Sequence, residues 1–152
     1  MQRSKLLIIF VIAVATLFTA GIINAGNTVQ DVIKMENPAY TKHKKSILMF
    51  SHKKHIEEYK AGCGDCHHDE NNKPLKDLKL GDDVRNCIEC HKIPGERPKG
   101  KNAPKLNKKE RLAYHAEAMH YNCKGCHKKY NRKNKTKAAP TTCKKCHPKN
   151  KK

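Results

Sequence analysis

The sequence predicts a small, mostly irregular and helical fold, in which short helices and loops surround a core that the polypeptide does not supply. Only 18 residues between Gly26 and Lys152 are Leu, Ile, Val, Phe or Met, and the chain has no Trp. Its net charge is +19, and its eight cysteines fall into four similar pairs. A chain this poor in apolar residues and this highly charged remains disordered unless another group provides the core.

The first 25 residues have the layout of a secretory signal peptide. Arg3 and Lys5 precede an uncharged apolar run from Leu6 to Ile23, and Ala25 offers a small-residue cleavage site before Gly26. We expect export and cleavage, which would place the rest of the chain in the periplasm. An uncleaved membrane anchor stays open, because a run of this length is near the lower limit for spanning a bilayer.

The cysteine pairs share one pattern: two residues separate the cysteines, and a histidine follows directly. The four sets are Cys63/Cys66/His67, Cys87/Cys90/His91, Cys123/Cys126/His127 and Cys143/Cys146/His147. Cys-x-x-Cys-His is the attachment signature of c-type haem. The two thiols form thioethers with one porphyrin, and the adjacent imidazole binds its iron. The sequence therefore predicts four covalently bound haems, which would also form the missing core.

Two other uses of the cysteines remain alternatives. Four pairs could build two zinc sites with four thiolates each, or form disulfides in an exported protein. Neither arrangement requires a histidine after every second cysteine, so haem is the favoured interpretation. A signal for export also argues against a nucleic-acid partner for this basic chain.

Six histidines lie outside these sets, and four of them would complete the axial coordination of four irons. We expect the second ligands to be His52, His55, His68 and His120, with His115 and His43 less suited. His67 and His68 are adjacent and point in different directions, so His68 should reach a second haem. Bis-histidine iron has no open position, which suits electron transfer rather than enzyme catalysis.

Local signals place the short elements. Ser51 and Gly62 would begin and end a helix that carries His52 and His55 on one face. Asn107 and Glu110 form a capping box at the start of a helix that leads to His115 and His120. A two-stranded ribbon fits near Ile47 to Phe50, and residues 94–109 and 128–142 are expected to be basic loops.

Two segments resemble the tetrahaem cytochromes c3 of sulfate-reducing bacteria. MFSHKKHIEEYKAGCGDCHH is similar to their haem-1 region, and AYHAEAMH to their Tyr-His-x-Met-His segment; the likeness covers about residues 47–147. It implies one haem per motif, with His52 opposite His67, His68 opposite His91, His55 opposite His127, and His120 opposite His147. It also places Phe50 near haems 1 and 3. The short spacing between His120 and Cys123 is more like that of the related trihaem cytochromes c7.

We divide the chain into a signal peptide (1–25), an N-terminal extension (26–46) and a tetrahaem domain (47–152). Residues 26–91 hold 11 basic and 11 acidic residues, whereas residues 92–152 hold 20 basic and 3 acidic. The basic half suits an acidic redox partner, although it could simply be a solvated surface that balances the haem propionates. The resemblance implies partners such as hydrogenase, formate dehydrogenase or a membrane redox complex.

The sequence therefore predicts a non-enzymatic periplasmic electron carrier. It would pass electrons from a periplasmic dehydrogenase to membrane or extracellular acceptors. Two alternatives remain open: a haem reductase of a small oxyanion or metal ion, and a membrane-anchored tetrahaem quinol dehydrogenase subunit that retains Leu6 to Ile23.

Overall fold

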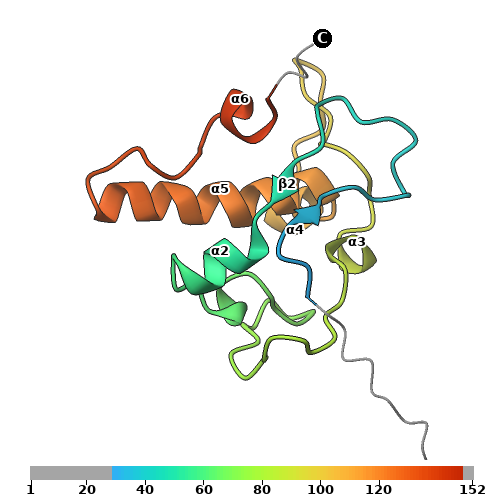
Figure 1. The fold of residues 1–152 in the computed structure, drawn as a ribbon. Helices are drawn as coiled ribbons and strands as arrows, with labels where there is room; N and C mark the ends of the chain where they lie inside the picture. The colour runs from blue at the N-terminus through green and yellow to red at the C-terminus, as the bar shows by residue number, and fades with distance from the viewer. Residues whose placement is uncertain (1–28, 149–152) are drawn as a thin grey trace, which may run out of the picture.

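The computed structural model describes residues 29–148, so the predicted signal peptide lies outside the described residues. The elements are short, and long loops connect them (Figure 1). In chain order they are β1 (Ile33–Lys34), β2 (Met49–Phe50), α2 (His52–Glu57), the 3₁₀ turn η1 (Cys63–Asp65), α3 (Cys87–Cys90), α4 (Lys108–Leu112), α5 (His115–Lys133) and α6 (Cys143–Cys146). The expected class, mostly helices and loops with a two-stranded sheet, is confirmed.

The ribbon forms where it was expected, and its second strand comes from the N-terminal segment. β1 and β2 are antiparallel, with Ile33 opposite Phe50 and Lys34 opposite Met49. A further backbone bond, from Met35 N to Leu48 O at 2.9 Å, extends the pairing by one step. Residues 29–46 are thus attached to the strand that leads into His52 and His55.

Helix α2 begins after Ser51 as predicted, but it ends before the expected stop at Gly62. Ala61 N donates to His55 O at 2.8 Å, and Lys60 adopts a positive φ of 54°. A residue with positive φ after a helix turns the chain away from the helix axis, and glycine is the usual choice for it. Lys60 takes that position here, two residues before Gly62.

Helix α4 carries the predicted capping box. Glu110 N donates to Asn107 Oδ1 at 3.0 Å, and Asn107 N donates to Glu110 Oε2 at 2.7 Å. Helix α5 then runs for 19 residues through the third cysteine motif. The prediction of a loop at 128–142 is wrong for residues 128–133, because the chain has no proline between Pro104 and Pro140 to end this helix earlier.

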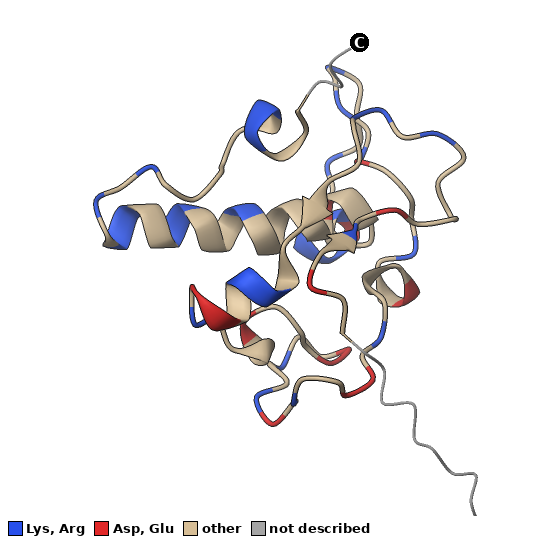
Figure 2. Cartoon of the chain, in the orientation of Figure 1, with Lys and Arg blue, Asp and Glu red and all other residues tan. Residues whose placement is uncertain are grey.

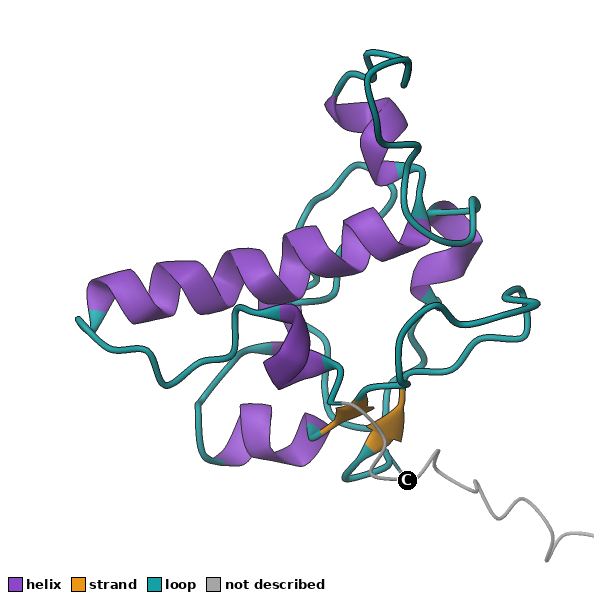
Figure 3. Ribbon diagram, turned by 90° about the horizontal axis from the view of Figure 1, so that it is seen from above, coloured by secondary structure: helices purple, strands orange, loops and turns teal. Residues whose placement is uncertain are grey.

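The described polypeptide builds almost no core of its own. Ala118 on α5 is the one buried hydrophobic residue found in the described range, and no side chain there is fully buried. Figure 3 shows α5 as the longest element, with the other helices held around it by loops. None of the helices in residues 29–148 is long and apolar enough to cross a membrane.

Candidate functional site

Each Cys-x-x-Cys-His motif is folded as a tight helical turn. In three of them the histidine N–H donates to the carbonyl of the first cysteine: His67 to Cys63 at 2.8 Å, His91 to Cys87 at 2.9 Å and His147 to Cys143 at 2.7 Å. The remaining motif, Cys123/Cys126/His127, lies inside α5. Residues three and four apart share one face of a helical turn, so both thiols and the imidazole of a motif lie on the same side.

Three motif histidines face a histidine from outside their own motif. The ring centroids of His55 and His127 lie 6.1 Å apart with the planes 23° from parallel. His68 and His91 are 6.0 Å apart, and His120 and His147 are 6.4 Å apart. These are three of the four histidine pairs that the sequence resemblance implies.

Within residues 29–148, the fourth expected pair, His52 and His67, is related by an electrostatic effect and not by a ring contact. Burial lowers the pKa of His67, and the neighbouring His52 and His68 lower it further. Nδ1 of His52 is buried without a hydrogen-bond partner among the described residues. Phe50 lies against both α2 histidines, with its ring centroid 5.8 Å from that of His52 and 4.7 Å from that of His55.

The spacing of the three facing pairs fits a metal ion between the rings. A metal–imidazole bond is about 2 Å long and the ring nitrogen lies about 1.1 Å from the centroid, so two imidazoles on one ion have centroids about 6.2 Å apart. The observed distances of 6.0, 6.1 and 6.4 Å fall around this value. Direct packing of aromatic rings, edge-to-face pairs included, also covers centroid distances of about 4.5–7 Å. The distances therefore match a shared metal ion without requiring one, and the tautomers of the rings give separate evidence.

Backbone carbonyls select the tautomer of five of these histidines. Nδ1 donates to a carbonyl in each case: His55 to Ser51 at 2.8 Å, His68 to Asp69 at 2.7 Å, His91 to Leu112 at 2.5 Å, His127 to Pro140 at 2.7 Å and His147 to Ser46 at 2.7 Å. A carbonyl can only accept, so the proton is on Nδ1. Nε2 therefore keeps a free lone pair, which is the form that binds a metal ion.

The loop after α5 is shaped to deliver one of these carbonyls. Asn131 Nδ2 donates to Ala139 O at 2.9 Å, and Ala139 N donates to Asn131 Oδ1 at 3.0 Å. This two-bond clamp holds the residue next to Pro140, whose carbonyl receives the proton of His127. No sequence motif marks Asn131, because its partners depend on the path of the loop.

All eight cysteines are free thiols in the structure. Burial raises the pKa of the Cys66, Cys87 and Cys146 thiols, and it raises the pKa of Cys123 to about 11. Cys66, Cys87 and Cys146 add to the shift at Cys123, so a thiol from each of the other three motifs lies near the third motif.

The alternative uses of the cysteines find no support in residues 29–148. No group of three or more His, Cys, Asp and Glu side chains there is arranged to hold a metal ion by itself. None of the eight cysteines, all within that range, forms a disulfide. The ligand geometry that the structure does contain consists of facing histidine pairs beside thiol pairs, which is the donor set of a c-type haem.

The two remaining histidines belong to a different contact. Tyr40 Oη lies 2.9 Å from His115 Nδ1, and the Tyr40 ring stacks on His43 with centroids 5.0 Å apart. Burial lowers the pKa of His115, and the nearby His91 lowers it further. The ring contacts that the structure describes for His43 and His115 are with Tyr40 and not with a motif histidine. Nothing in the sequence indicated that Tyr40 would contact both of them.

Comparison with known proteins identifies the family. The model of the class III cytochrome c family matches residues 28–147, which include β1 and the segment before Ile47. A search among individual curated proteins found no match. Proteins of this family bind c-type haem, transfer electrons through several haems and are typically periplasmic. With well over half of its length matched, this chain belongs to the class III cytochrome c family.

Proposed function

We propose that this protein is a periplasmic electron carrier with four covalently bound haems, each iron held between two histidines. Haem 1 would be held by Cys63, Cys66, His67 and His52, and haem 2 by Cys87, Cys90, His91 and His68. Haem 3 would be held by Cys123, Cys126, His127 and His55, and haem 4 by Cys143, Cys146, His147 and His120.

One observation carries this proposal: three motif histidines face an outside histidine at the ring separation that a shared metal ion requires. The Nδ1 donation to backbone carbonyls supports it independently, since it leaves Nε2 free on five of these rings. The absence of an apolar core among the described residues is a third support, because haems would fill the space that side chains leave.

A bound haem supplies reversible one-electron chemistry at its iron. The residues of this chain hold that group and control its surroundings. The cysteines would attach it covalently, and the paired imidazoles would bind its iron. Carbonyl acceptors such as Ser51 O and Pro140 O orient the imidazoles and strengthen them as ligands. No side chain is assigned an acid–base role.

The elements that carry the ligands also keep the sites close to one another. His67 and His68 are adjacent but are assigned to haems 1 and 2. His52 and His55 lie one turn apart on α2 and are assigned to haems 1 and 3. His120 and His127 lie two turns apart on α5 and are assigned to haems 4 and 3. Short separations of this kind favour electron hopping within one molecule.

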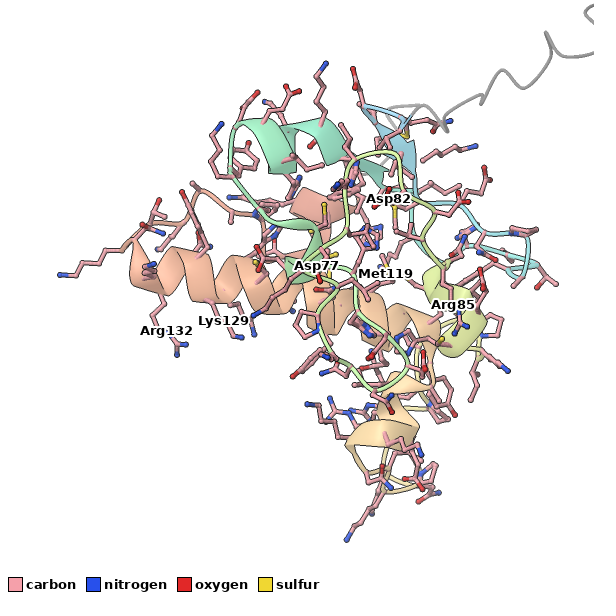
Figure 4. All side chains as sticks on the ribbon, turned by 90° about the horizontal axis from the view of Figure 1, so that it is seen from below. Asp77, Asp82, Arg85, Met119, Lys129 and Arg132 are labelled. Carbon is pink, nitrogen blue, oxygen red and sulfur yellow. The ribbon has the colours of Figure 1, made fainter. Side chains whose placement is uncertain are left out.

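The basic half of the chain is proposed to dock an acidic redox partner, such as a hydrogenase, a formate dehydrogenase or a membrane redox complex. Figure 2 shows Lys and Arg repeated along α5 and present on α6. Lys129 and Arg132 extend from the same side of α5 (Figure 4). Such a surface steers an acidic partner and makes its association rate fall as salt rises. Stopped-flow oxidation by an acidic acceptor at increasing ionic strength would test this.

Export rests on the layout of residues 1–25. We expect the protein purified from a periplasmic extract to begin at Gly26, as read by N-terminal sequencing. A mature chain that begins at Met1 or Gln2 and fractionates with membranes would instead favour the anchored quinol dehydrogenase subunit.

The main test is a haem count together with an absorption spectrum. We expect four haems per chain, and sharp low-spin bands in the reduced protein that carbon monoxide leaves unchanged. A carbon monoxide shift would reveal an open iron and favour the reductase. We would look for it first at the Cys63–Cys66–His67 motif, because His52 and His67 make no ring contact among the described residues. Protein without haem, made in a host that matures c-type cytochromes, would contradict the proposal.

A further inference from the structure

The segment 93–97 is fastened to the start of α5. Ile93 N donates to Ala113 O at 3.0 Å, and His115 N donates back to Ile93 O at 2.8 Å. Ala116 N donates to Gly95 O at 3.1 Å. The side chains of Arg97 and Glu117 add an ion pair at 3.8 Å. Glu96 therefore sits in a segment held at both sides, although it belongs to a loop rich in proline, glycine and lysine.

This attachment puts a carboxylate beside one proposed axial ligand. Glu96 Oε1 lies 3.9 Å from Nδ1 of His120. The Nδ1 atoms of five other paired histidines meet neutral backbone carbonyls instead. Among the described paired histidines, His120 is the one whose Nδ1 faces a negatively charged group. The difference lies on the side of the ring away from the metal-binding nitrogen, where second-shell groups act on a ligand.

We propose that Glu96 lowers the reduction potential of the haem held by His120 and His147. The inference rests on the proposed function, because it requires an iron at that histidine pair. The oxidised iron carries one more positive charge than the reduced iron. A nearby carboxylate stabilises the oxidised form through its negative charge.

The geometry sets the size of the effect. At 3.9 Å the oxygen is too far for a hydrogen bond, so Glu96 acts as a nearby charge. The side chains of His120 and Glu96 are 49% and 43% exposed, which means that water screens the charge substantially. We expect removal of the charge to favour reduction of this haem by a factor of three to ten, which corresponds to about 30–60 mV for one electron.

Lys99 opposes Glu96 and supplies a second variant. Its Nζ donates to the other carboxylate oxygen, Glu96 Oε2, at 2.7 Å. Removing Lys99 takes away a positive charge and leaves the carboxylate uncompensated beside His120. The reduction potential of the same haem should therefore fall, in the direction opposite to the effect of removing Glu96.

Glu36 is a matched control for Glu96. It is 48% exposed, it is paired with a lysine, Lys34, and it lies near a histidine, His43, that is not proposed to bind iron. Glu36→Gln changes the net charge of the protein by the same amount as Glu96→Gln. Any general effect of net charge on all four haems will therefore appear in both variants.

The experiment is a redox titration of the holoprotein followed by NMR, in which the methyl signals of each haem are tracked separately. In Glu96→Gln we expect the haem attached to Cys143 and Cys146 to be reduced three to ten times more readily, with the other three nearly unchanged. In Lys99→Met the same haem should become harder to reduce, and Glu36→Gln should shift no single haem. If both proteins hold four low-spin haems and the potential of the haem attached to Cys143 and Cys146 is the same in Glu96→Gln as in wild type, this inference is overturned. The proposed function then stays intact. A wild type in which His120 binds no iron would overturn both.

Discussion

Helices α2 and α5 each carry two proposed axial ligands, but they position them in different ways. Helix α2 has six residues and no buried side chain, and its histidines lie one turn apart. Helix α5 has 19 residues, contains Ala118, and carries His120 and His127 two turns apart, a rise of about 10 Å. Helix α5 also contains the complete third cysteine motif, of which His127 is the histidine.

The two helices differ in what stabilises them. An isolated six-residue helix is not stable in water, so α2 depends on what its histidines bind and on Phe50 packed against them. Helix α5 sets its ligand spacing through its own backbone bonds. We therefore expect the α5 register to control haems 3 and 4, and the α2 region to become ordered only when haems 1 and 3 are in place.

The largest effect should come from removing haem 3, because its ligands His55 and His127 join α2 to α5. The double variant Cys123→Ser/Cys126→Ser should contain three haems. Loss of so large an apolar group should cost at least about 5 kcal/mol, more than truncation of any one aromatic side chain. The melting temperature should fall by about 20 °C or more.

The matched variant Cys143→Ser/Cys146→Ser removes haem 4, whose ligands join α5 to the last helix only. It should also retain three haems but unfold at a clearly higher temperature than the first variant. Haem staining with thermal denaturation followed by circular dichroism measures both. Equal melting temperatures would show that the connection of α2 to α5 through haem 3 stabilises the protein no more than the connection of α5 to α6 through haem 4.

A smaller and more local effect should follow from changing the α5 register. One alanine inserted between Tyr121 and Asn122 turns His120 by about 100° relative to His127. His120 should then no longer face His147, and one of four haems should bind carbon monoxide. One alanine inserted after Lys137, in the following loop, should leave all four haems unreactive. Absorption spectra of the reduced proteins decide between these results.

The Asn131 clamp offers a test of moderate size. Asn131→Ala removes both bonds to Ala139 and should destabilise the protein by about 1–3 kcal/mol. The control is Asn134→Ala, because the Asn134 side chain makes one exposed bond, to Tyr130 O, and should contribute less than about 0.5 kcal/mol. Chemical denaturation of the two holoproteins compares these values, and a similar loss in both would contradict the clamp.

The smallest effect should be at His115, which lies outside both ligand sets. His115→Gln should keep four low-spin haems and lose about 1 kcal/mol with the Tyr40 bond. Burial holds the pKa of His115 below its ordinary 6.5. The unfolded chain therefore binds a proton first as the pH falls below 6.5, and wild-type stability decreases from that point. Between pH 7 and pH 5 the free energy of unfolding, measured by urea denaturation, should decrease less in the variant than in wild type. Loss of a haem in the variant would instead place His115 among the iron ligands.

Much of the site was accessible from the sequence because covalent attachment of haem requires a fixed local pattern. The four motifs, the choice of His52, His55, His68 and His120, and the capping box at Asn107 all depend on short spacings. The ligand assignments remain predictions, whereas the family, the capping box and the two-stranded ribbon are confirmed.

The features that could not be predicted depend on contacts between distant segments. Ser46 O receives the proton of His147 across 101 residues, and Tyr40 reaches His115 across 75. Glu96 approaches His120 only because its segment is bonded to α5. The continuation of α5 to Lys133 was missed for another reason: a run of lysines suggests a loop by composition, while nothing in it prevents a helix.

The most direct test of the central claim is near-infrared magnetic circular dichroism of the oxidised protein, which distinguishes low-spin haems with two histidine ligands from those with methionine or an open position. The account predicts four bis-histidine haems per chain and no other signal. A methionine-ligated or high-spin haem would contradict it, and it would show that at least one of the four proposed histidine pairs does not hold iron.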